Sequence, residues 1–154
     1  MCGPNAGTEQ PWLSLQRHLE RSDRFTLVLL ISADPSILET FYRHLKIQTP
    51  CVQIIPLDET AAHWVDTLES ALAPDDALIQ RHVPVWLALD CHPTDPGTDR
   101  QRDVILAALN QHRTQLERSF RRPLLIALPP SYLRRIWEIA PDLWTIRGIV
   151  VQIP

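Results

Sequence analysis

The apolar run at residues 25–31 is the sequence feature that most constrains the fold. It reads Phe-Thr-Leu-Val-Leu-Leu-Ile and does not alternate with polar residues. A strand with one face in water alternates, whereas a strand covered on both faces does not. Residues 83–90 and 124–128 have the same character, and shorter apolar runs occur at 52–56 and 149–153. We therefore predict five strands in a mostly parallel sheet that is covered on both faces.

Helical patterns separate these runs. Residues 35–46, for example, place Ile37, Leu38, Phe41, Tyr42 and Leu45 on one side of a helix. Similar stripes predict helices at 11–21, 60–72, 99–119 and 131–137. Alternating strands and helices with right-handed crossovers indicate an α/β three-layer sandwich of the Rossmann or P-loop NTPase type.

Length and composition bound the class of protein. With 154 residues, the chain fits one domain, which we place at 11–154 after a flexible N-terminus at 1–10. No apolar run approaches the roughly 20 residues of a membrane span, and the N-terminus does not resemble a signal peptide. Cys2, Cys51 and Cys91 form no CxxC pair. We expect a cytoplasmic protein with reduced thiols and no structural zinc.

The first strand-to-helix turn is where a parallel α/β sheet usually holds phosphate. Here the turn reads Ile-Ser-Ala-Asp-Pro-Ser at 31–36, without glycine or lysine. Both GxGxxG and GxxxxGK[ST] are absent. Asp34 would repel a phosphate and Pro35 lacks an N–H donor, so we predict no tight phosphate site. Capping of the next helix is the role expected for Asp34.

The third predicted strand ends in Asp90, followed by Cys91 and His92. Four apolar residues and an Asp are also the pattern that holds magnesium in triphosphatases, but many buried strands end in this way. Three adjacent residues cannot all face one ion, because successive side chains on a strand point to opposite faces. We therefore assign no metal site, and keep Asp34, Asp90 and His92 as weak candidates for a nucleotide or catalytic site.

Charge is distributed unevenly along the chain. Residues 1–99 contain 6 Lys or Arg and 14 Asp or Glu, whereas residues 100–154 contain 9 and 4. The basic part supplies the candidate partner-binding residues Arg113, Arg118, Arg121, Arg122, Arg134 and Arg135. The pI near 6.0 and the lack of a reader motif argue against nucleic-acid binding. His112 falls in the apolar stripe of its helix, which indicates a core histidine rather than a catalytic base.

Three stretches carry a family resemblance: 109–113, the apolar strand followed by Pro129-Pro130, and Ala-Pro-Asp-Leu-Trp-Thr-Ile-Arg at 140–147. They resemble the degenerate STAND-type NTPase domains of bacterial conflict and signalling proteins. The resemblance implies that the first strand stands where a Walker A strand would be and Asp90 where Walker B would be. It does not carry ATP hydrolysis with it, because the glycines and lysine are missing. Trp144 is expected in the core, and Arg147 beside Asp142 or a helix end.

These observations favour a non-catalytic adaptor or regulatory domain that acts through protein contacts in a bacterial defence or signalling system, with no cofactor. The alternative is a small enzyme or nucleotide-binding protein that uses Asp34, Asp90 and His92. The absence of a phosphate loop favours the adaptor over the nucleotide-binding alternative.

Overall fold

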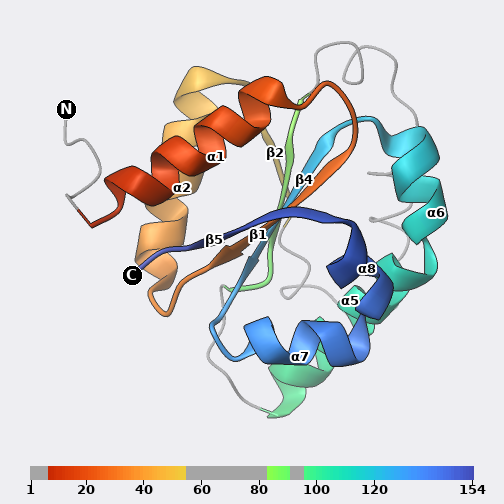
Figure 1. Ribbon diagram of the computed structural model, residues 1–154. Helices are drawn as coiled ribbons and strands as arrows, with labels where there is room; N and C mark the ends of the chain where they lie inside the picture. The colour runs from red at the N-terminus through yellow and green to blue at the C-terminus, as the bar shows by residue number, and fades with distance from the viewer. Residues whose placement is uncertain (1–6, 55–82, 91–95) are drawn as a thin grey trace.

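A computed structural model describes residues 7–54, 83–90 and 96–154. Its centre is a five-stranded sheet in which every strand pair is parallel (Figure 1). The strands are β1 (Thr26–Ile31), β2 (Val52–Ile54), β3 (Val85–Ala88), β4 (Pro123–Leu128) and β5 (Arg147–Gln152). The predicted α/β fold with a parallel five-stranded sheet is confirmed. β1, β3 and β4 are buried throughout, as their continuous apolar sequences predict.

The strand order is β2-β3-β4-β1-β5, so β1 lies between β4 and β5. In the dinucleotide-binding Rossmann order, by contrast, the first strand pairs with the second. From β1 the chain moves past β4 and β3 to the edge strand β2. From β2 each later strand is placed in the opposite direction along the sheet, ending at the other edge with β5. Because crossovers are right-handed, opposite directions place helices on opposite faces.

One face is covered by α1 (Glu9–Arg21) and α2 (Pro35–Gln48), which lie side by side (Figure 1). Trp12 and Leu15 of α1 and Leu38 and Phe41 of α2 belong to one buried cluster with Val28 of β1 and its neighbours in the sheet. The Trp12 and Phe41 rings meet edge to face, with centroids 5.6 Å apart. This contact joins the two helices.

The other face is covered by α5 (Pro96–Gln111), α7 (Tyr132–Ile139) and α8 (Pro141–Ile146). Between α5 and β4 lie a short α6 (Arg113–Gln115) and a π-helical turn, η2 (Leu116–Phe120). Ile105, Leu109, Leu116 and Phe120 are buried against alternate residues of the strands. Arg121, with φ of 41°, ends this segment in the left-handed region.

Three predictions differ from the structure. The single helix expected at 99–119 breaks at His112, which is half-buried at the start of α6, so its assignment to the core is wrong. α1 begins at Glu9, within the segment predicted to be a flexible N-terminus. α8 was not predicted as a helix. The helix predicted at 60–72 lies outside the described residues.

Within the described ranges, no helix has the length and apolar character needed to cross a bilayer.

Candidate functional site

The carboxyl ends of β3, β4 and β1 are adjacent and form the edge where α/β sheets bind ligands. Leu89 N donates to Ala127 O over 3.0 Å, and Ser32 N donates to Leu128 O over 3.4 Å. Ser32 forms the second of these contacts, and Asp90 directly follows Leu89, which forms the first. Both residues are buried, at 3% and 7% exposure. The candidates Asp34 and Asp90 therefore belong to one edge, as predicted. His92 lies outside the described residues.

Asp34 closes the turn between β1 and α2. Its Oδ1 accepts hydrogen bonds from Ser36 N at 2.9 Å and from Ser36 Oγ at 2.6 Å. The Ile37 amide donates to Asp34 O at 3.1 Å, and Pro35 has no N–H. The predicted capping role is confirmed. The helix N-terminus that would attract a phosphate already carries the chain's own carboxylate.

The electrostatics of this turn agree with its geometry. Hydrogen bonds from the Ser36 side chain and then its amide hold the pKa of Asp34 below its ordinary value. Asp34 therefore remains an anion at neutral pH, and an approaching phosphate would meet a like charge rather than free N–H donors.

A shallow pocket of about 260 Å³ lies beside this turn, between α2 and the ends of β2 and β3. Ser36 and Glu39 of α2 line one side, and Gln53 and Asp90 come from the sheet end. Trp86 and Ala88 contribute apolar surface. Among the described residues that line it, two are carboxylates and none is a Lys or Arg. This charge disfavours a phosphorylated ligand.

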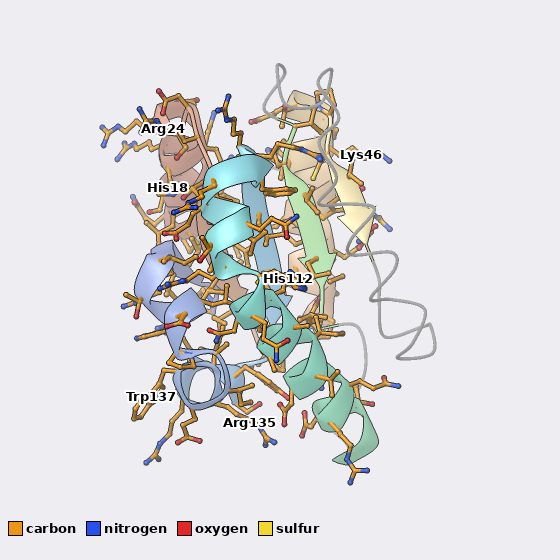
Figure 2. All side chains as sticks on the ribbon, turned by 90° about the vertical axis from the view of Figure 1, so that its right-hand side faces the viewer. His18, Arg24, Lys46, His112, Arg135 and Trp137 are labelled. Atoms are coloured by element: carbon orange, nitrogen blue, oxygen red, sulfur yellow. The ribbon has the colours of Figure 1, made fainter. Side chains whose placement is uncertain are left out.

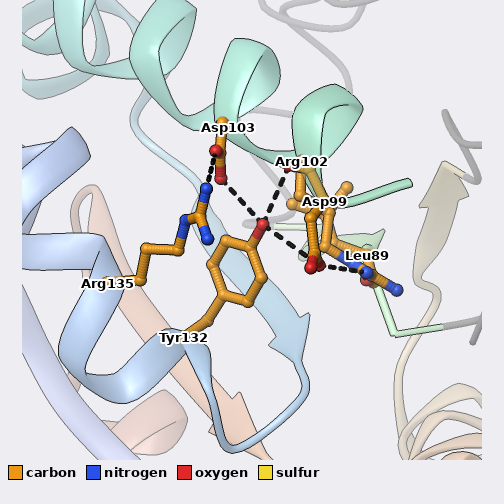
Figure 3. A network of polar contacts seen from close by, with 6 residues as sticks. All are labelled: Leu89, Asp99, Arg102, Asp103, Tyr132 and Arg135. Atoms are coloured by element: carbon orange, nitrogen blue, oxygen red, sulfur yellow. Dashed lines mark hydrogen bonds and ion pairs between the residues drawn. The ribbon is translucent and has the colours of Figure 1, made fainter. Parts of the chain in front are cut away.

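Under the same edge lies a polar network that sequence reasoning missed (Figure 3). Arg102 of α5 is fully buried, and its Nε donates to Leu89 O at the end of β3. Its Nη1 lies 3.0 Å from Asp99 Oδ1. A buried guanidinium is costly unless it is paired, and these contacts pair it with two acceptors while tying α5 to the sheet.

Tyr132 joins α7 to the same network. Its hydroxyl donates to Asp103 Oδ1 at 2.7 Å and lies 2.9 Å from Asp99 O, while Arg135 pairs with Asp103. Burial first, and then Asp103, raise the pKa of Tyr132, so it remains a neutral hydrogen-bond donor. These side chains hydrogen-bond or pair with one another and with the backbone, and so join α5, α7 and β3. Only the 3- and 4-residue spacing of Asp99, Arg102 and Asp103 on one helix could have signalled the network from sequence.

The candidate arginines do not form one surface. Arg121 and Arg122 directly precede β4, whereas Arg134 and Arg135 follow it in α7. A six-residue strand separates the two pairs by about 20 Å. Arg135 and Trp137 both lie on α7 but extend from different sides of the helix (Figure 2).

Several of these arginines also have structural roles. Arg122 is only 3% exposed, and its Nε donates to Val83 O at 2.7 Å, so its assignment as a contact residue is wrong. Arg113 lies 3.7 Å from Asp142. Arg118, Arg121 and Arg134 remain exposed on the surface.

Two of the three stretches that carry the family resemblance, 109–113 and 140–147, are in direct contact. Asn110 Oδ1, at the end of α5, accepts from the amides of Asp142 and Leu143 at 2.9 and 3.1 Å and so caps α8. Arg147 stacks on Trp144, 3.6 Å from the ring centroid, and donates to Trp144 O. This places Arg147 at a helix end, one of its two predicted partners. Trp144 packs against the core without being fully buried.

The Cys51 thiol and possible metal ligands are the remaining reactive groups of the described residues. Burial raises the pKa of Cys51 to about 12, so its thiol is protonated and unreactive at neutral pH. In the described part of the chain, no three His, Cys, Asp or Glu side chains gather as metal ligands would.

The fold and this edge define an α/β parallel-sheet protein whose first strand-to-helix turn is closed by its own carboxylate. No family model and no curated protein matches the chain. Among solved structures, it is similar to a crystal structure of the DnaC helicase loader. The two share 7% sequence identity with a TM-score of 0.49, over 100% of this chain and 94% of the other.

Proposed function

We propose that this chain is a non-catalytic adaptor or regulatory domain that acts through protein contacts. The observation that carries the proposal is the Asp34 carboxylate, which accepts hydrogen bonds from the Ser36 amide and hydroxyl at the start of α2. This is the position where an active nucleotide-binding domain would hold phosphate. Following the sequence resemblance to degenerate STAND domains, we place this role in a bacterial defence or signalling system.

The exposed surface supports contact with proteins. Trp137 is 52% exposed on α7, and Arg134 on the same helix is exposed as well. Trp and Arg are the residue types most often found at the energetic centre of protein interfaces. We therefore take α7 as the first contact candidate, and the separate pair Arg118 and Arg121 as the second.

Affinity capture from the native host with the immobilised chain tests this proposal. We expect one specific protein to be retained. Its retention should be lost either in the single variant Arg134→Glu or in the double variant Arg118→Glu/Arg121→Glu, because each variant reverses the charge of one candidate contact surface. Arg17→Glu, an exposed arginine on α1, is the matched control and should retain the protein. A chain that captures nothing beyond bare beads would contradict the proposal.

The competing function is nucleotide binding or catalysis through Asp34, Asp90 and His92. The pocket beside Asp90 is the observation in its favour. Against it stand the two carboxylates that line this pocket and the hydrogen bonds that already engage Asp34. Nucleotide titration separates the two functions.

A further inference from the structure

A second pocket lies at the opposite edge of the sheet, where the strands begin. It has a volume of about 290 Å³ and lies between α1 and α2. Its apolar surface comes from Trp12 and Leu19 of α1, Leu45 of α2, and Pro84 and Pro123 at the strand starts. This volume is at the small end of ligand pockets, which suits one long side chain rather than a nucleotide.

The rim of this pocket is rich in hydrogen-bond acceptors. Both helices end here, with their C-cap residues Ser22 and Thr49 in the lining. The last carbonyls of a helix carry a partial negative charge, although here His18 O and Leu19 O already accept from Ser22, and Leu45 O accepts from Thr49 N. Glu20 adds a carboxylate, and Pro84 and Pro123 have no N–H to offer. The rim therefore favours a cation.

The basic residues of the same two helices point elsewhere. At 100° per residue, Arg17 and Arg21 lie on the side of α1 away from Trp12, Gln16 and Leu19. Lys46 Nζ lies 6.0 Å from the centroid of the Tyr42 ring. Arg24, beyond the end of α1, lies 4.0 Å from Asp23. Of the described residues that line the pocket, none is a Lys or Arg.

We infer that this pocket binds the lysine or arginine side chain of a partner protein. The alkyl stem packs on the apolar floor, and the charged end meets Glu20 and the two helix C-termini. The choice of a protein as the partner rests on the proposed function, whereas the preference for an alkyl cation rests on the pocket itself.

An NMR titration of the whole chain tests the preference with three probes of similar shape: n-pentylammonium, 1-pentanol and pentanoate. We expect saturable shifts of the Trp12 indole N–H and the Ser22 and Thr49 amides with n-pentylammonium, and at least about tenfold weaker binding of the other two. A neutral or anionic probe that binds as tightly as n-pentylammonium would overturn the inference, as would the absence of saturable shifts with all three.

Two matched variants locate the effect. Glu20→Gln should weaken n-pentylammonium binding about two- to fivefold, the size of a surface charge interaction. Glu9→Gln removes the same charge from the first turn of α1, away from the pocket, and should leave binding unchanged. Equal weakening by both variants would show a general charge effect and overturn the site.

The two proposals fail in different ways. If the chain captures a specific protein but does not bind n-pentylammonium, the pocket inference fails and the adaptor function stands. If n-pentylammonium binds at the pocket and the chain also binds ATP tightly, the adaptor function fails while the pocket's chemistry stands.

Discussion

Gly148 lies in β5 beside His18 of α1 and Thr26 at the start of β1. A Cβ at this position would lie 2.5 Å from Thr26 Oγ1 and 2.6 Å from His18 Nε2. Those two atoms are themselves joined by a hydrogen bond of 2.7 Å. The glycine is therefore required by close approach, because any side chain would separate His18 from Thr26.

Gly148→Ala should destabilise the fold by about 1–3 kcal/mol, the usual cost of overpacking. Gly7→Ala is the matched control, since among the described residues a Cβ there would meet only Pro154 Cγ, at 3.9 Å. Its change should stay within about 0.5 kcal/mol. Urea denaturation measures both. Equal stability of the two variants would show that the close approach does not constrain the fold.

His18 makes stability depend on pH. Burial lowers the pKa of His18 from its ordinary value of 6.5 in the folded state, so the unfolded chain takes up the proton first. Its contribution to stability is present above pH 6.5 and is lost as pH falls from there toward the folded-state pKa. Melting temperatures measured between pH 7.5 and 5 should fall, and His18→Gln should flatten the fall. An unchanged slope in the variant would contradict this role.

At the scale of elements, α8 depends on α5 for its start. The two α8 amides capped by Asn110 have no capping side chain of their own, since Ala140 precedes the helix. A six-residue helix is too short to be stable alone. The contact between Asn110 and α8 therefore holds this helix, and the start of β5 that follows it, against the sheet.

Asn110→Ala should cost about 1 kcal/mol, the typical value of a lost cap, as measured by chemical denaturation. Asn110→Asp keeps the acceptor oxygen. Its added charge is favourable at the N-terminus of α8 but unfavourable in the last turn of α5, so the two effects offset and most of the stability should be preserved. Similar losses in both variants would indicate that the side-chain oxygen is not the stabilising group.

Sequence reasoning predicted elements well where burial decides the pattern. β1, β3 and β4 are continuous apolar runs, and α2 has a clear stripe, so their existence followed from periodicity. The break at His112 was not predictable, because no Pro or Gly marks it and the π-turn at Leu116–Phe120 depends on packing. α8 was missed because its cap comes from a residue 32 positions earlier.

The local part of the candidate site could be predicted from sequence, whereas the part that depends on contacts between distant residues could not. Capping by Asp34 is a local interaction, and its sequence Asp-Pro-Ser is enough to indicate it. The network of Arg102, Asp103 and Tyr132 depends on α5 and α7 meeting across the sheet end, a contact between residues about 30 positions apart. The arginine candidates failed as one surface because a buried strand runs between them.

At the scale of the whole molecule, two edges of one sheet have different chemistry. The carboxyl edge carries the closed turn, Asp90 and the internal network, whereas the amino edge carries the acceptor-rich pocket between α1 and α2. A parallel sheet of this kind usually presents its ligand at the carboxyl edge. Here the first turn of that edge is closed by the chain's own carboxylate. This is the basis of our proposal that the chain binds proteins rather than nucleotides.

Calorimetric titration of the full chain with ATP and GTP in the presence of Mg²⁺ tests this central claim most directly. We expect no saturable heat at millimolar nucleotide, because the Asp34 carboxylate already accepts from the Ser36 amide and hydroxyl at the start of α2. Micromolar binding that disappears in Asp90→Ala would contradict it and would place a working nucleotide site at the carboxyl edge.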